Sequence, residues 1–154
     1  MKQIKHGKWN AYISFDPNSW FGYVYQITDT QTNMKYIGSK QFVNKIRRKP
    51  LKGKKRVRLD TRTSDWLKYT GSSKALNIVI EQYINHIKLI TKENIVDLDT
   101  VLEKRFTFDI LSLHDTKFQL SYAENRLIYV TDAMLDEKYY NCFTSRLGNK
   151  KDFT

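Results

Sequence analysis

The sequence predicts an α+β fold in which a small three-stranded antiparallel sheet is flanked by helices, with the elements in the order β-β-α-α-β-α. Two neighbouring segments rich in aromatic and β-branched residues predict a β-hairpin, Gly22–Thr28 and Met34–Gly38. A third strand is expected at Phe106–Leu113, and apolar residues recur at helical spacing elsewhere. The chain has 154 residues, of which 40% are hydrophobic, so we expect one domain with one core.

The register of the hairpin decides how two tyrosines are placed. If Thr28 pairs with Asn33, residues 29–32 form the loop, and Tyr25 lies directly opposite Tyr36 on one face of the sheet. A slip by one residue would put the two side chains on opposite faces. We therefore expect the two phenols to lie side by side.

A short helix is expected directly after the hairpin. It begins near Ser39, because Phe42 and Ile46 are four residues apart and share one helical face. It ends by Lys49, because Pro50 disfavours helical backbone in the residue before it. The basic residues that follow are expected to form a loop.

Two longer helices carry clearer patterns. One is expected over residues 73–85 with Ser73 as its N-cap, and the other over residues 119–135, where apolar residues form a stripe. Between them, residues 87–104 alternate in charge and predict an insertion with one short helix.

The same patterns give the organisation of the chain. Residues 1–19 are expected to form an N-terminal arm, residues 20–145 one domain, and residues 146–154 a polar tail that frays. Within the domain, the basic stretch 45–65 and the stretch 87–104 are expected to be insertions.

Charge gives the first indication of function. The chain holds 27 Lys and Arg against 16 Asp and Glu, for a net charge of +11, and residues 45–62 alone contribute +9. The segment has one acid, Asp60, and ten basic residues: Lys45, Arg47, Arg48, Lys49, Lys52, Lys54, Lys55, Arg56, Arg58 and Arg62. Such a run favours binding to a polyanion, above all nucleic acid. A solvated loop is the plain alternative, and a membrane surface is disfavoured because no apolar face interleaves the charges.

The other residue counts exclude several classes of protein. The single cysteine cannot form an internal disulfide, and three scattered histidines cannot complete a zinc site with it, so we expect a reducing compartment. No apolar stretch is long enough to span a membrane, and the basic opening lacks the apolar core of a signal peptide.

Two short motifs on the hairpin suggest a family. The runs Gly22-Tyr23-Val24-Tyr25 and Tyr36-Ile37-Gly38-Ser39 resemble the signature of the GIY-YIG endonucleases. The second run contains Tyr-Ile-Gly itself, whereas the first reads Tyr-Val-Tyr after a glycine that is displaced by one place. The resemblance covers roughly residues 20–143 and implies the GIY-YIG fold and metal-dependent hydrolysis of DNA.

The resemblance also implies a set of catalytic residues. Tyr25 or Tyr36 would be the general base, and Glu124 would be the single protein ligand of a divalent metal, Mg²⁺ or Mn²⁺. An arginine would face the scissile phosphate, and Arg47 and Arg48 both fall near the family's position. A phenol with a free pKa near 10 would need nearby positive charge, or would relay a proton.

Two further matches lie later in the chain. Asn141 follows Glu124 at about the family's spacing and would help orient the site and the phosphate. The stretch Trp66–Ser73 is similar to one in a phage subgroup, where backbone N–H groups at the helix start, near Ser72 and Ser73, would hold a phosphate.

Taken together, these features predict an endonuclease acting on duplex DNA, of the phage homing or DNA-degrading type, in the cytoplasm of a bacterial host. The alternative is a catalytically inactive nucleic-acid-binding protein on the same scaffold, or a small factor that grips RNA. The sequence leaves open whether the protein is a monomer or a homodimer, and whether it nicks or cuts both strands.

Overall fold

The computed structural model describes residues 2–92, 95 and 97–144. The elements in chain order are β1 (Ile4–His6), β2 (Trp9–Ala11), the 3-10 helix η1 (Pro17–Ser19), β3 (Gly22–Asp29), β4 (Met34–Gln41), β5 (Val43–Arg48), β6 (Arg58–Thr63), α1 (Lys74–Thr91), α2 (Leu98–Glu103), β7 (Phe106–His114) and α3 (Lys117–Val130). The α+β class is confirmed, but the main sheet has five strands in the order β1-β2-β7-β3-β4 rather than three.

The two extra strands come from the N-terminal segment that was expected to be an arm. β1 and β2 pair as an antiparallel hairpin, and β2 joins β7 in parallel. The alternating Trp9 and Ala11 side chains are buried, which holds the hairpin on the sheet. Strands of three residues give too little alternation to be recognised from sequence.

The β3–β4 hairpin confirms the expected strands but not the expected register. Tyr25 pairs with Gly38, and Tyr36 pairs with Ile27, two residues away from the predicted pairing. A shift of two keeps both tyrosines on the same face, where they are diagonal neighbours rather than directly opposite. The physical reason lies in the turn, which is closed by a hydrogen bond of 2.7 Å from Asn33 N to Asp29 O, with Asn33 in the left-handed region.

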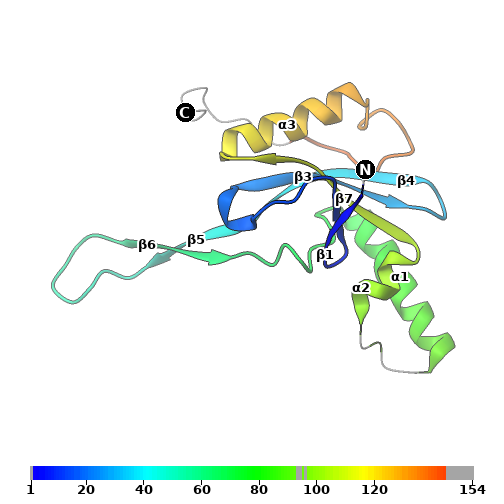
Figure 1. Ribbon diagram of the computed structural model, residues 1–154, viewed down its shortest axis with the longest axis horizontal. Coiled ribbons are helices and arrows are strands. Elements are labelled where there is room, and N and C mark those ends of the chain that lie inside the picture. The colour runs from blue at the N-terminus through cyan, green and yellow to red at the C-terminus, as the bar shows by residue number, and fades with distance from the viewer. Residues whose placement is uncertain (1, 93–94, 96, 145–154) are drawn as a thin grey trace.

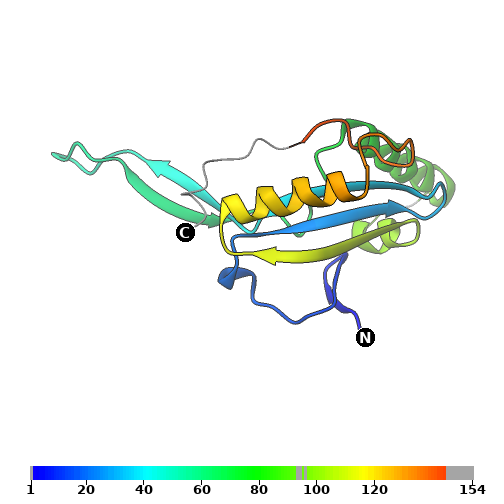
Figure 2. The ribbon, with the colours of Figure 1, turned by 90° about the horizontal axis from the view of Figure 1, so that it is seen from above.

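The helix predicted over residues 39–49 is wrong. β4 continues to Gln41 because it pairs with β3, and β5 begins at Val43, where the chain pairs with β6. Phe42 and Ile46 are an even number of residues apart, so the spacing that suggested a helix also fits a strand. The basic loop is corrected too: β5 and β6 form a separate two-stranded sheet that projects from the body (Figures 1 and 2).

The remaining helices agree with expectation in kind and differ in length. The Ser73 hydroxyl accepts a hydrogen bond of 3.3 Å from Leu76 N and caps α1, as predicted. α1 runs to Thr91, so the predicted insertion begins inside it, and α2 is the short helix expected there. α3 ends at Val130, five residues before the predicted end. The predicted tail, 146–154, lies outside the described residues.

The helices cover the two faces of the sheet. α3 lies across one face, and α1 and α2 lie on the other side, at the end opposite the β5–β6 hairpin (Figures 1 and 2). The face away from α3 is aromatic, with Trp9, Tyr23, Tyr25 and Phe108 buried in one cluster. No helix in the described part of the chain is long and apolar enough to cross a membrane.

Candidate active site

β4 is an edge strand, and side chains from both its faces meet helices at that edge. Tyr36 is 8% exposed, and its hydroxyl lies 2.7 Å from Ser72 Oγ, just before α1. A cavity of about 460 Å³ opens here, lined by Tyr36, Ser72, Ser73, Lys74, Ala75, Tyr140, Asn141, Cys142 and Phe143. The predicted Tyr36 and the predicted Ser72 and Ser73 are therefore brought together.

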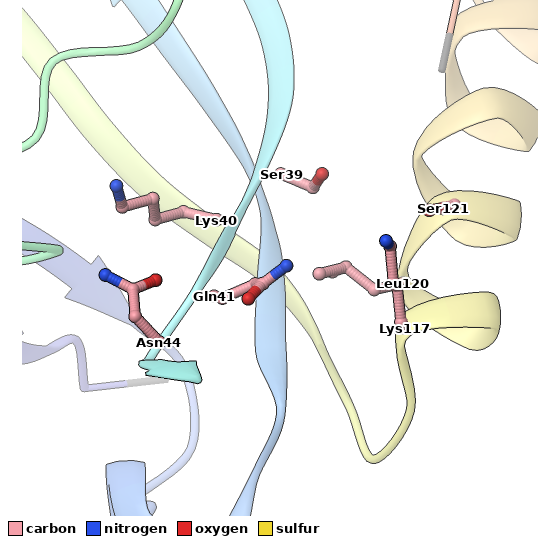
Figure 3. Close-up of a pocket in the computed structure, with 7 residues that line it drawn as sticks. All are labelled: Ser39, Lys40, Gln41, Asn44, Lys117, Leu120 and Ser121. Carbon is pink, nitrogen blue, oxygen red and sulfur yellow. The ribbon is translucent and has the colours of Figure 1, made fainter. Parts of the chain in front are cut away.

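Glu124 reaches the same strand from α3. It is 8% exposed, and Ser39 Oγ donates a hydrogen bond of 2.7 Å to Glu124 Oε2. A second cavity, of about 280 Å³, lies beside Ser39 and is lined by Ser39, Lys40, Gln41, Asn44, Lys117, Leu120 and Ser121. In Figure 3, Ser39 and Gln41 point toward α3, whereas Lys40 points away on the other side of β4.

The charge of Glu124 acts on Tyr36 across the edge of the sheet. Alternation along β4 puts Tyr36 on the aromatic face and Ser39 on the α3 face. Burial raises the pKa of the Tyr36 phenol, the hydrogen bond to Ser72 opposes the rise, and the nearby charge of Glu124 adds to it. The net pKa is raised, so Tyr36 is protonated at neutral pH.

Asn141 holds the edge strand in place. Its Nδ2 donates 2.8 Å to Ile37 O, and its Oδ1 accepts 3.0 Å from Ile37 N, between Tyr36 and the residues that face Glu124. The segment before it runs beside β4, with Lys35 N donating to Lys138 O and Tyr140 N donating to Lys35 O, both at 2.8 Å. Asn141 is thus near the site, and its amide is used by the backbone of β4.

Tyr25 shares a face with Tyr36 but lies deeper. Its side chain is fully buried, with its ring centroid 6.2 Å from that of Tyr36 and 5.2 Å from that of Trp9. Burial raises its pKa well above 10, and the neighbouring phenols Tyr69 and Tyr36 add to the rise. Of the two candidate bases, Tyr36 lines a cavity and Tyr25 does not.

Neither candidate arginine is brought to Glu124. Arg47 and Arg48 lie on β5 and are exposed, and Arg48 pairs with Asp60 across the hairpin at 2.8 Å. The hairpin points away from the sheet (Figure 1). The expected position of these arginines depended on a helix after β4. The strand β5 instead carries both residues away from the main sheet.

Three site residues were missed by the sequence analysis. Ser39 and Lys40 directly follow Tyr-Ile-Gly, and their succession on an edge strand sends one side chain to each face. Lys117 lies seven residues before Glu124, which is the spacing of a shared helical face. Lys40 pairs with Asp65 at 2.6 Å and lies 4.1 Å from the centre of the Tyr69 ring.

The donor set fits one kind of metal. In the described part of the chain no three His, Cys, Asp or Glu residues gather in a way that could hold an ion. Zinc and structural calcium need such clusters, whereas Mg²⁺ keeps several waters and takes one or two carboxylates together with phosphate oxygens. A single carboxylate, Glu124, beside a polar cavity is compatible with that pattern.

The eight basic residues predicted to contact nucleic acid lie on the projecting hairpin, whereas Ser72 and Ser73 lie just before α1. Lys45, Arg58 and Arg62 are exposed on its strands. The other five are exposed at its tip: Lys49, Lys52, Lys54, Lys55 and Arg56. The hairpin contains one acid, Asp60, and is therefore the main concentration of positive charge in the chain.

Comparison with known proteins identifies the family of the chain. The family model described as "Putative endonuclease segE, GIY-YIG domain" matches residues 6–143. No curated protein and no solved structure matches the chain. The match begins in β1, continues past Asn141 and includes every element around Glu124. The chain therefore belongs to the segE-type GIY-YIG family of endonuclease domains.

Proposed function

We propose that the protein is a metal-dependent endonuclease that hydrolyses phosphodiester bonds in duplex DNA at the edge of β4. The observation that carries the proposal is Glu124, a nearly buried carboxylate held by Ser39 beside a polar cavity. The strongly basic β5–β6 hairpin begins two residues after β4 ends, so it is joined directly to the strand that carries Ser39.

Glu124 is the residue that would hold Mg²⁺ or Mn²⁺. Such an ion supplies Lewis-acid chemistry, polarising the phosphate and stabilising the leaving oxygen. Ser39 fixes one carboxylate oxygen by its hydrogen bond, which holds the group in one orientation.

Tyr36 and Ser72 would accept the proton that the attacking water loses and pass it on. Because Tyr36 is protonated at neutral pH, it does not act as a preformed phenolate. When the Tyr36 oxygen takes a proton from the attacking water, its own proton passes to Ser72 Oγ, 2.7 Å away. Ser72 is exposed and can release a proton to solvent.

Lys117 would supply positive charge at the phosphate. Lys117 lines the cavity beside Ser39, and its ammonium group would serve as a point charge for a phosphate oxygen. The Lys40 side chain points to the other side of β4, where it pairs with Asp65 (Figure 3). In this account Arg47 and Arg48 bind DNA on the hairpin and do not face the scissile phosphate.

The experiment is incubation with supercoiled plasmid in Mg²⁺ or in EDTA. The wild-type protein is expected to remove supercoils only with metal, and Glu124→Gln is expected to abolish the reaction. Glu81→Gln, an exposed change on α1, is the matched control and should cleave normally. With one site per chain, open circles should accumulate before linear DNA. Cleavage by a folded Glu124→Gln protein at the wild-type rate would contradict the proposal.

An inactive nucleic-acid-binding protein is the second candidate, and the hairpin alone would support it. That protein would shift the plasmid on a gel with a steep salt dependence and yield no product with any metal. Whether the biological role is gene mobility or degradation of DNA is a separate matter, which product specificity would decide.

A further inference from the structure

We propose that the β5–β6 hairpin is a ribbon that enters the major groove of DNA and contacts both bordering phosphate backbones. The inference rests on the proposed function only in taking duplex DNA as the partner. It assigns a binding mode to a hairpin whose sequence indicated only an affinity for polyanions.

The first observation is that cations project from both faces of the ribbon. Antiparallel pairing sets Lys45 opposite Thr61 and Arg47 opposite Leu59, which puts Lys45 and Arg47 on one face. Arg48 pairs with Arg58, and Arg62 follows on that strand four residues later, so these three share the other face.

Positive charge on both faces of the ribbon favours its insertion into a groove of DNA over contact through one face only. A ribbon lying on one anionic surface would need cations on one face only. The two phosphate backbones that border a groove present an anionic wall on each side. Of the exposed cations on the strands, Arg48 has a carboxylate partner, Asp60, and Lys45, Arg47, Arg58 and Arg62 have no ion-pair partner among the described residues.

The dimensions select the major groove. Paired strands lie about 4.8 Å apart, and six residues span about 20 Å. A major groove about 12 Å wide admits a two-stranded ribbon, whereas a minor groove about 6 Å wide does not.

The tip of the ribbon adds apolar contact. Leu51 and Val57 are each 49% exposed, and Leu59 is 69% exposed. They line a hollow of about 470 Å³ together with Lys54, Arg56 and Arg58. Exposed aliphatic groups between cations suit the groove floor, where thymine methyl groups and base edges are in reach.

The base of the ribbon is fixed to the core. Phe42, between β4 and β5, is 2% exposed and packs at right angles on Trp66, with ring centroids 5.0 Å apart. Ser64, which follows β6, donates from its backbone N to Phe42 O at 2.8 Å. These contacts anchor the base of the ribbon at the end of β4, the strand whose Ser39 holds Glu124.

The experiment measures binding of the full chain to a short duplex by fluorescence anisotropy in EDTA, over a range of salt. Two variants each remove two charges: Lys45→Gln with Arg47→Gln from one face, and Arg58→Gln with Arg62→Gln from the other. Lys88→Gln with Lys104→Gln removes two exposed charges from α1 and the end of α2 and is the matched control.

Both ribbon variants are expected to lose about tenfold or more in affinity, and to lower the slope of log K against log salt by about 1.8, while the control stays at the wild-type slope. Loss from one face alone, or equal effects of ribbon and control, would overturn the proposal. Methyl green, which occupies the major groove, should compete, and competition by the minor-groove ligand netropsin in its place would also overturn it.

A circular dichroism spectrum and thermal unfolding check that each variant keeps its fold. The outcomes separate the two proposals. If the wild-type protein fails to bind duplex DNA at all, the proposed function itself is wrong. If it binds and cleaves DNA but the ribbon variants behave like the control, the nuclease stands and the groove-entering ribbon does not.

Discussion

Gly38 shows how a single residue shapes the site. A Cβ at this position would stand 2.6 Å from Tyr25 Cζ and 3.1 Å from Tyr36 Cε1, closer than packed atoms tolerate. Gly38 is paired with Tyr25 in the sheet, so neither ring can move aside without disturbing β3 or β4. The glycine of Tyr-Ile-Gly is therefore needed here for close packing of two tyrosine rings, and not for an unusual backbone angle.

Gly38→Ala is expected to destabilise the protein by about 2 kcal/mol, the cost of forcing one methyl group into a filled core. Urea unfolding measures it. Gly53→Ala is a contrasting variant: Gly53 has open space around its Cα but a φ of +80°, so any cost there comes from the backbone and not from packing. An unchanged midpoint for Gly38→Ala would show that the rings do not pack as described.

The two tyrosines are expected to differ in function. Tyr36→Phe removes the hydroxyl that contacts Ser72 and should lower the cleavage rate at least tenfold. Tyr25→Phe changes a fully buried group and should leave the rate within about threefold. Single-turnover rates with saturating protein separate this from weaker binding. A larger loss for Tyr25→Phe than for Tyr36→Phe would assign the roles the other way round.

At the scale of the element, β4 is held by contacts at the β3–β4 turn and along its outer edge. Asp29, at the end of β3, is fully buried and accepts two hydrogen bonds from Arg105, at 2.9 and 2.7 Å. This pair ties the β3–β4 turn to the start of β7. The segment ending at Asn141 covers the outer edge of β4, which would otherwise offer unpaired backbone groups.

The Asp29 pair predicts a pH dependence of stability. Burial alone would raise the pKa of Asp29, but the hydrogen bonds from Arg105 and from backbone N–H outweigh it, and the net pKa is lowered. A lowered folded pKa gives stability that is present above the unfolded value, about 3.9, and is lost as pH falls through the folded value.

Asp29→Asn should therefore cost about 3 kcal/mol at pH 7, because Arg105 loses its partner, and the difference from wild type should shrink below about pH 4. Asp60→Asn is the control, since Asp60 also pairs with an arginine but is fully exposed, and its change should have little effect. Urea titrations at several pH values measure both. A constant difference across this range would contradict the linkage.

Sequence reasoning succeeded for elements with strong local patterns and failed where tertiary pairing decides. The β3–β4 strands, β7, and the capped start of α1 carry clear alternation or capping residues. β5 was taken for a helix because Phe42 and Ile46 fit both periods, and only pairing with β6 decides between them. The hairpin register was off by two residues because the turn closes at Asn33 in a left-handed conformation, which alternation cannot reveal.

For the whole molecule, the main concentration of positive charge lies apart from the candidate site. The ribbon carries most of the net charge, while the body, close to neutral, carries Glu124, Tyr36 and Asn141 at one edge of the sheet. The sequence could indicate these three residues because the resemblance fixes their spacing. It could not place the cations, because a lysine or arginine near the motif can lie at the site or on the ribbon, and only the path of the chain after Gln41 decides.

The central claim is that one carboxylate, Glu124, makes DNA cleavage possible at the edge of β4. The most direct measurement is the single-turnover rate of cleavage of a linear duplex with Mg²⁺ by the wild-type and Glu124→Gln proteins, both at concentrations that saturate binding. The account predicts that Glu124→Gln binds the duplex as tightly as wild type and cleaves it at least about 100-fold more slowly. Equal rates for the two folded proteins would contradict it and move the active centre away from α3.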